Sequence, residues 1–216
     1  MTELVRSAAE AYALAHTTPA EGVLDQVASW TQRETSAPGM MSGLAEARLL
    51  EVLIVASGAR RVLEIGTFTG FGTLTMAAAV GPEGHVTTLE VDGDTAATAA
   101  RHFETSPHGD RIELIVGHAL DTLTRLDGPF DLVYIDAWKA DYPAYYDAVV
   151  PKLAPRGVVV ADNLFRAGAV LESGGDAGTE AMRAFAGYVQ KDSRMHNVLL
   201  TIGDGVMVAW PAPEGA

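Results

Sequence analysis

The stretch RVLEIGTFTGFG, residues 61–72, decides the fold. Its first half is a short, bounded apolar run that predicts a buried parallel strand, and a helix is expected after the glycines, over residues 73–80. In open α/β sheets a strand, a glycine turn and a helix bring bare backbone and a helix N-terminus against a ligand. The stretch therefore predicts a ligand-binding edge of a sheet, with an ordinary tight turn as the alternative.

Two details of this turn indicate which ligand it would bind. Gly66, Gly70 and Gly72 are spaced G-x-x-x-G-x-G, whereas dinucleotide-binding turns have G-x-G-x-x-G. Glu64 stands just before the first glycine, and a carboxylate there would bind a cation better than a pyrophosphate. Both details point to S-adenosylmethionine, whose amino acid portion carries an ammonium group.

The composition is that of a globular protein. The chain has 216 residues, of which 48% are hydrophobic and 20% charged, enough for one domain with a substantial core. A net charge of −13 repels phosphate groups and makes nucleic acid and membrane surfaces poor partners. The absence of cysteine excludes disulfides and thiolate metal sites. With no signal peptide or membrane span in sight, we expect a cytoplasmic protein.

Strands and helices alternate after an N-terminal part, residues 1–57, that predicts three helices. Further strands are expected at 85–90, 111–116, 130–135 and 157–161, and helices at 94–104, 120–126, 142–153 and 179–191. Residues 197–202 and 206–210 flank Gly203-Asp-Gly205 and predict a β-hairpin. A glycine-rich, mobile loop is expected at 167–178. The pattern predicts a single domain over residues 1–216: a doubly wound, Rossmann-like α/β sheet of seven strands, the last antiparallel, with helices on both faces.

Oxygen-bearing side chains follow the fourth and fifth predicted strands. Asp136 ends one strand, and Asp162 and Asn163 end the other. Neighbouring parallel strands lie about 4.8 Å apart, so these side chains would converge at the carboxyl edge of the sheet. Two carboxylates and a carboxamide suit a hard divalent cation, Mg²⁺ first, with Mn²⁺ or Ca²⁺ as alternatives. A turn merely capped by Asp162 and Asn163 is the competing interpretation.

The positions of Lys139 and Glu90 predict a function for each. Lys139 follows Asp136 by one helical turn, which would place its amine beside the carboxylate. An amine beside a bound metal loses its proton more readily and can act as a base; a surface lysine paired with Asp141 is the alternative. Glu90, at the end of the second strand, is placed to accept the ribose hydroxyls of a nucleoside cofactor, or is simply a solvated acid.

Together these segments resemble the cation-dependent O-methyltransferases, the family that includes catechol and caffeoyl-CoA O-methyltransferases, in its bacterial-type branch. The resemblance runs from about Met40 to Trp210 and is strongly specific because its motifs occur in one order. The motifs are LEIGTFTGFG, Leu89-Glu90, Gly117-His-Ala119, YIDAWKADYPAYYD, VVADNLFRAGAV and Ile202-Gly-Asp-Gly205.

The resemblance implies methyl transfer from S-adenosylmethionine to a hydroxyl of a small catechol-like or other vicinal-dioxygen acceptor. It assigns a divalent metal to Asp136, Asp162 and Asn163, and catalysis to Asp136 and to Lys139 as general base. It also implies a homodimer. Residues 1–57 would contribute both to the dimer and to the substrate site. The implied cofactor contacts are Met40, Ser42, Glu64, Gly66, Thr67, Phe68, Gly70, Gly72, Glu90, Val91, His118, Ala119, Asp136 and Tyr145. The implied substrate contacts are Met40, Trp138, Lys139, Asn163 and Arg166.

The chain departs from the family pattern at four places. Gly72 stands where a serine is usual, which removes a hydroxyl near the methionyl carboxylate. Trp138 replaces an acid, Arg166 stands where an aromatic residue is usual, and residues 43–47 read GLAEA in place of Ser-Pro-Glu-Gln-Gly. The last three fall where the substrate or its lid would lie, so they leave the acceptor open and the reaction intact.

Two other functions compete with methyl transfer. A nicotinamide oxidoreductase on a related sheet is disfavoured by the glycine spacing and the C-terminal hairpin. A non-catalytic S-adenosylmethionine-binding relative is disfavoured because it would have no need of Lys139 and all three metal ligands.

Overall fold

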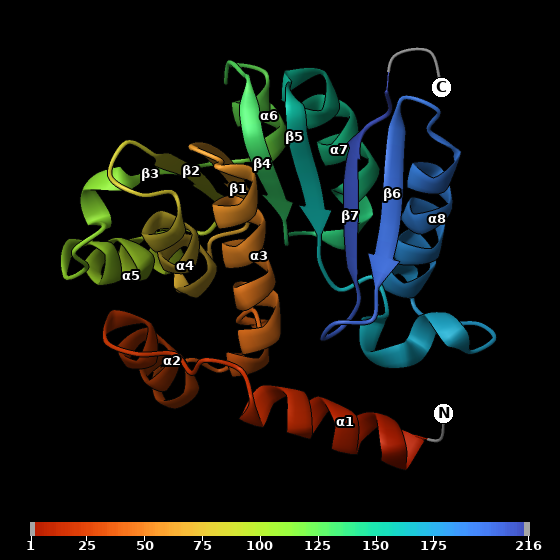
Figure 1. Cartoon of the computed structure of the whole chain (residues 1–216), viewed down its shortest axis with the longest axis horizontal. Coiled ribbons are helices and arrows are strands. Elements are labelled where there is room, and N and C mark those ends of the chain that lie inside the picture. Colours follow the sequence, from red (N-terminus) through yellow and green to blue (C-terminus); the bar gives the residue numbers. More distant parts are fainter. Residues whose placement is uncertain (1–2, 214–216) are drawn as a thin grey trace.

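A seven-stranded sheet forms the centre of the protein (Figure 1). The computed structural model describes residues 3–213, with side chains from residue 8 onward. The strand order is β3-β2-β1-β4-β5-β7-β6, and β7 alone runs antiparallel to the other six strands. The strands are β1 (Arg61–Ile65), β2 (His85–Glu90), β3 (Ile112–Val116), β4 (Phe130–Ile135), β5 (Leu153–Ala161), β6 (Met195–Leu200) and β7 (Val206–Pro211). The doubly wound sheet with its C-terminal hairpin is confirmed.

Helices cover both faces of this sheet and extend the N-terminal part beyond its edge (Figure 1). The α-helices are α1 (Glu3–Ala15), α2 (Val23–Glu34), α3 (Leu44–Ser57), α4 (Phe71–Ala79), α5 (Gly93–Glu104), α6 (Ala119–Leu123), α7 (Tyr142–Val149) and α8 (Ala177–Lys191). Short 3₁₀ helices are η1 (Pro38–Met40), η2 (Gly109–Arg111), η3 (Lys139–Asp141), η4 (Val150–Lys152) and η5 (Arg166–Leu171). No helix within residues 3–213 is long and apolar enough to cross a membrane.

Several predicted boundaries were wrong; for example, the strand expected at 157–161 begins at Leu153 and the helix expected at 120–126 ends at Leu123. The helix expected over 142–153 is α-helical only as far as Val149 and continues as the 3₁₀ helix η4. The α-helix ends there because Pro151 lacks the N–H that an α-helix needs. The segment 167–178, expected to be a mobile loop, includes most of the 3₁₀ helix η5. Arg183 of α8 holds this segment through hydrogen bonds to its backbone. The guanidinium of Arg183 donates to the carbonyls of Val170, Gly174 and Ala169 at 3.1, 2.7 and 2.9 Å.

Alternate residues of the central strands face two cores. Leu132 and Val160 pack with Leu50 and Ile54 of α3 on one side of the sheet. Side chains of the opposite parity pack under α7 and α8, in a cluster that includes Leu63, Val133, Ile135, Tyr146 and Phe185. Burial of both faces explains why these strands read as continuous apolar runs.

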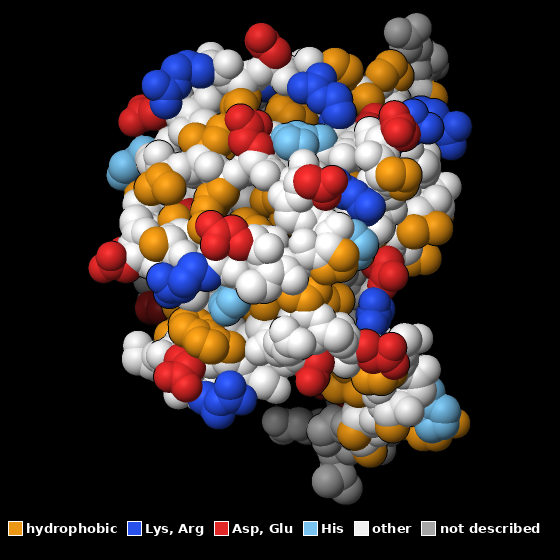
Figure 2. Space-filling view, turned by 90° about the vertical axis from the view of Figure 1, so that its left-hand side faces the viewer, with side chains coloured by type: hydrophobic (Ala, Val, Ile, Leu, Met, Phe, Trp, Pro, Cys, Tyr) orange, Lys and Arg blue, Asp and Glu red, His pale blue; other side chains and the backbone are white. Residues whose placement is uncertain are grey.

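Charged groups are mixed on the face formed by α5 and β3. Acidic, basic and hydrophobic side chains are interspersed there, with no broad basic patch (Figure 2). This face therefore lacks the positive surface that nucleic acid binding requires.

The strand register gathers the predicted site at one edge. Ile65 pairs with Ile135, and Ile135 with Ala161, so the residues after these three stand side by side at the carboxyl ends of β1, β4 and β5. Those residues are Gly66, Asp136 and Asp162. The strand order reverses between β1 and β4, which is where open α/β sheets bind their ligands.

Candidate active site

The glycine turn and the end of β4 touch each other. Gly66 has φ +102°, and a Cβ added there would lie 1.9 Å from the carbonyl oxygen of Asp136. Next to this contact the Asp136 amide donates to the Ile65 carbonyl at 2.9 Å. Only glycine allows this approach, so the predicted cofactor turn and the first predicted metal ligand are neighbours.

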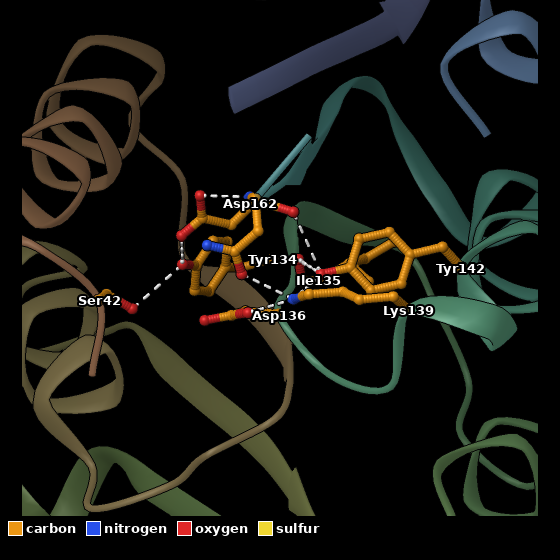
Figure 3. Close-up of polar contacts among 8 residues, drawn as sticks. Ser42, Tyr134, Ile135, Asp136, Lys139, Tyr142 and Asp162 are labelled. Carbon is orange, nitrogen blue, oxygen red and sulfur yellow. Dashed lines mark hydrogen bonds and ion pairs between the residues drawn. The ribbon is translucent and has the colours of Figure 1, made fainter. Parts of the chain in front are cut away.

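Lys139 brings the predicted ligands of two strands together (Figure 3). Its Nζ donates to Asp136 Oδ1 at 2.9 Å, to Asn163 Oδ1 at 2.7 Å and to the Tyr142 hydroxyl at 2.8 Å. Lys139 begins η3, whose turn points the amine back at Asp136, and its side chain is 16% exposed. The alternative of a surface lysine paired with Asp141 is wrong.

Asp162 lies in the same cluster and is almost fully buried. Its Oδ1 accepts a hydrogen bond from the backbone N–H of Asn163 at 2.6 Å, and its Oδ2 accepts one from the Tyr134 hydroxyl at 2.9 Å. Burial, and next the charge of Asp136, raise the pKa of the Asp162 carboxyl well above its usual value. Asn163 adopts φ +61°, a left-handed conformation that asparagine tolerates better than most residues. The turn-capping interpretation holds for one oxygen of Asp162, while the other points to Tyr134.

These residues fit a hard divalent cation. Oxygens of Asp136 and Asn163 already converge on a positive charge, the ammonium of Lys139, which stands in for a metal ion. The set is two carboxylates and one amide oxygen, a small all-oxygen set of the kind Mg²⁺ uses when water or substrate completes its shell. No three His, Cys, Asp or Glu side chains in the described part of the chain form a separate metal cluster.

Glu64 lies beneath the glycine turn with 1% of its surface exposed. Its Oε2 accepts hydrogen bonds from the hydroxyls of Thr73 and Thr88, the latter at 2.5 Å. Its Oε1 would be 2.8 Å from a Cβ at Gly72, so the missing side chain there makes room for the carboxyl group. Burial is the main cause that raises the pKa of Glu64 to about 8. The expected contact with an ammonium group stays a prediction.

Glu90 fixes the turn to the end of β2. Its Oε2 accepts the Phe68 amide at 2.9 Å, while Oε1 accepts the amides of Val91 and Asp92 at 2.9 and 3.1 Å. Phe68 has φ +49°, a strained conformation for a side chain of its size that this hydrogen bond helps to hold. On this count Oε1 uses both of its lone pairs and Oε2 retains one, so Glu90 can still accept a ribose hydroxyl through Oε2.

The remaining predicted cofactor residues differ in accessibility. Thr67 is buried, with its hydroxyl 2.6 Å from that of Thr88, and Gly70 caps α4. Val91 and His118 are exposed at the ends of β2 and β3. Ala119, partly buried, begins α6, and Ser42 lies between η1 and α3. Tyr145 is 5% exposed in the core, with its hydroxyl 3.4 Å from Asp141 Oδ2. Their roles stay predictions.

The predicted substrate residues other than Lys139 and Asn163 lie at the surface or turn aside. Met40 and Trp138 are 62% and 72% exposed. Arg166, with φ +50°, pairs through Nη2 with Asp176 Oδ2 at 2.9 Å and covers Gly178 at the start of α8. The structure thus gives Arg166 a role in holding η5 to α8, and a substrate contact by it is still a prediction.

Two tyrosines, Tyr134 and Tyr142, belong to the site although they are absent from the predicted site residues. The Tyr142 hydroxyl accepts from Lys139 and donates to the Ile135 carbonyl at 3.2 Å. Tyr134 stands in a central strand whose neighbours are aliphatic, and burial is the main cause that raises its pKa well above 10. A buried tyrosine hydroxyl needs a partner, and here the partner is Asp162, 28 positions later, so no local signal in the sequence identifies it.

Comparison with known proteins decides the family. The sequence model of the O-methyltransferase family matches residues 15–210. The chain belongs to this family. The predicted resemblance is therefore confirmed, and the nicotinamide oxidoreductase is not favoured.

Individual relatives agree with this O-methyltransferase assignment. The chain is 43% identical over 148 residues to the catechol O-methyltransferase of Mycobacterium tuberculosis, covering 68% of this chain and 67% of that protein. The O-methyltransferase TomG of Streptomyces achromogenes, solved in complex with SAM, is 31% identical with a TM-score of 0.87, covering 99% and 100% of the two chains. Podospora anserina methyltransferase PaMTH1, at 24% identity and a TM-score of 0.90 over 99% and 97%, shares the fold.

Proposed function

We propose that this O-methyltransferase transfers a methyl group from S-adenosylmethionine to one hydroxyl of a small acceptor that carries two vicinal oxygens. The observation that carries the proposal is the contact between Gly66 and Asp136, because it sets a glycine turn of methyltransferase type against a group of oxygen ligands. The relative from Streptomyces was solved with SAM, and the relative from Mycobacterium is named a catechol O-methyltransferase, which supports the donor and the acceptor class.

Asp136, Asp162 and Asn163 would hold the divalent cation, Mg²⁺ first. When bound, such an ion acts as a Lewis acid and template that lowers the pKa of a coordinated hydroxyl and fixes two neighbouring oxygens. This role favours a catechol over a simple phenol. The carboxyl group of Asp162 is restrained by the Asn163 amide and the Tyr134 hydroxyl, so its orientation is set before any ligand arrives.

Lys139 would accept the hydroxyl proton of the acceptor. In the structure its Nζ rests among the same oxygens, with all three ammonium hydrogens engaged by Asp136, Tyr142 and Asn163. To act as a base, Lys139 would first release one ammonium proton to solvent, and the neutral amine would keep Tyr142 as a partner and direct its lone pair at the hydroxyl of the acceptor. The donor supplies an electrophilic sulfonium methyl group, and positioning the acceptor oxygen in line with it would provide much of the rate.

The experiment is product detection with a panel of diphenols. The purified protein, S-adenosylmethionine and Mg²⁺ are incubated with catechol-type 1,2-diphenols, with a 1,3-diphenol and with a monophenol, and products are identified by mass. Monomethyl ethers from the 1,2-diphenols alone would support the proposal. Equal methylation of the monophenol would contradict chelation, and no binding of S-adenosylmethionine in calorimetry would contradict the donor. Light scattering would test the homodimer, which belongs to the same proposal.

A further inference from the structure

The hydroxyl group of Tyr134 connects Ser42, a predicted cofactor contact, with Asp162, a predicted metal ligand (Figure 3). The side chain is 1% exposed on β4, and its hydroxyl donates to Asp162 Oδ2 at 2.9 Å. The same oxygen lies 3.1 Å from Ser42 Oγ. A phenol carries one hydrogen, and here it goes to the carboxylate, so Ser42 must be the donor in the second bond. The three residues form a chain of hydrogen bonds that runs from Ser42 through Tyr134 to Asp162.

The Ser42 end of this chain lies beside the first turn of α4. Its Oγ would be 3.7 Å from a Cβ at Gly72, the second residue of that helix. The free N–H groups at such a helix start favour an anionic group of a ligand. A hydroxyl at this place can donate to that anion or to Tyr134. Its single hydrogen cannot serve both at full strength.

The Asp162 end is the proposed metal ligand, and Tyr134 restrains one of its two oxygens. We propose that Tyr134 is a positioning residue that couples cation binding at Asp162 to cofactor binding beside Ser42, an inference that rests on the function proposed above. When Ser42 turns its hydrogen to the anionic group of the cofactor, Tyr134 loses the bond that polarises its own hydroxyl. Its donation to Asp162 weakens, and the carboxylate keeps more negative charge for the cation. Each ligand then raises the affinity for the other by the same factor.

A packing role for Tyr134 makes a different prediction. Its ring lies in the core with Leu132 and Val160, and a phenylalanine would keep that ring. Replacing Tyr134 by Phe therefore removes the hydrogen-bond chain and leaves the apolar contacts in place. Tyr146→Phe is the matched control, because Tyr146 is also fully buried and its hydroxyl bonds Asp192 Oδ2 at 3.1 Å, outside the chain of hydrogen bonds.

The test is calorimetric titration of Mg²⁺ into the full-length protein with and without saturating S-adenosylhomocysteine, which carries the cofactor's carboxylate and cannot react. For the wild type we expect the nucleoside to tighten Mg²⁺ binding about fivefold, at the low end of typical coupling between sites. Tyr134→Phe should bring this factor close to one, and Tyr146→Phe should leave it as in the wild type. Ser42→Ala should abolish the coupling as Tyr134→Phe does, and it decides the question if Tyr134→Phe does not fold.

The possible failures are distinguishable. A wild-type protein that binds S-adenosylhomocysteine and Mg²⁺, with the same coupling in Tyr134→Phe or in Ser42→Ala, would overturn the inference and leave the proposed function standing. A wild-type protein that binds no divalent cation in either titration would contradict the proposed metal site, and the inference would fall with it. Loss of coupling in the Tyr146→Phe control as well would show a general effect of deleting a buried hydroxyl, which also overturns the inference.

Discussion

Lys139 Nζ and Asn163 Oδ1 lie 2.7 Å apart, although 24 positions separate the two residues in the chain. The ends of β4 and β5 create this contact, because neighbouring parallel strands bring their carboxyl ends to the same edge. A positive charge therefore occupies the position between Asp136 and Asn163 before any metal arrives. Lys139 and a divalent cation would compete for the same oxygens.

Replacing Lys139 by alanine should separate its role as an internal cation from its proposed role as general base. Without the ammonium group, Mg²⁺ binding should become tighter, because no internal cation competes for Asp136. Turnover should fall by about 10²- to 10⁴-fold, as expected for loss of a general base. Calorimetry and steady-state methyl transfer measure the two effects. Lys191→Ala, at the exposed end of α8, is the control, and unchanged turnover in Lys139→Ala would refute the assignment of the base.

Replacing Gly66 by alanine should strongly destabilise the protein. The new Cβ would meet the Asp136 carbonyl at 1.9 Å, in addition to backbone strain at φ +102°. Gly81→Ala is the control, since Gly81 has φ +74° and nothing within 4 Å of the added atom. We expect about 1–2 kcal/mol for the strain alone at Gly81, and a clearly larger loss at Gly66, in urea unfolding. Equal losses would show that the contact with Asp136 is easily relieved.

Glu64 should make stability depend on pH in the neutral range. Its pKa is about 8 in the folded protein against an ordinary value of 4.5, so between these values the folded state binds more protons than the unfolded state. Stability from this group is therefore complete below about pH 4.5 and is lost as pH rises through about 8. As pH rises over that window, the free energy of unfolding of Glu64→Gln should increase relative to that of the wild type, by an amount on the order of a few kcal/mol.

Urea unfolding at a series of pH values, with a chelator present, measures this difference. Glu104→Gln replaces an exposed acid of α5 and serves as the control. A constant difference between wild type and Glu64→Gln across pH 5–9 would contradict the raised pKa of Glu64.

The sequence carried enough information for the sheet and for the principal ligands. Apolar runs such as residues 130–135 mark strands that are buried on both faces, and alternation with helices predicts a doubly wound, mainly parallel sheet. If the fourth and fifth strands are parallel neighbours, Asp136 and Asp162 must meet at one edge. The glycine spacing after Ile65 then separates this turn from a dinucleotide-binding one.

The details that depend on distant neighbours could not be predicted. The segment 167–178 looked mobile because its glycines are visible in the sequence, whereas the carbonyl contacts of Arg183 come from the next helix. The hydroxyls of Tyr134 and Tyr142 point at partners set by the packing of β4 against β5 and α7. Local pattern gives a residue's face on an element and does not give the direction of its hydrogen bonds.

The most direct test of the central claim is methyl transfer to catechol before and after removal of divalent metal. The protein is depleted with a chelator, dialysed and assayed with S-adenosylmethionine, then assayed again with Mg²⁺, alongside Asp162→Asn as a variant that lacks one ligand charge. We predict that depleted wild-type protein forms no methyl ether, that Mg²⁺ restores the activity, and that Asp162→Asn stays inactive at the same Mg²⁺ concentration. Full activity of the depleted wild-type protein would contradict the account.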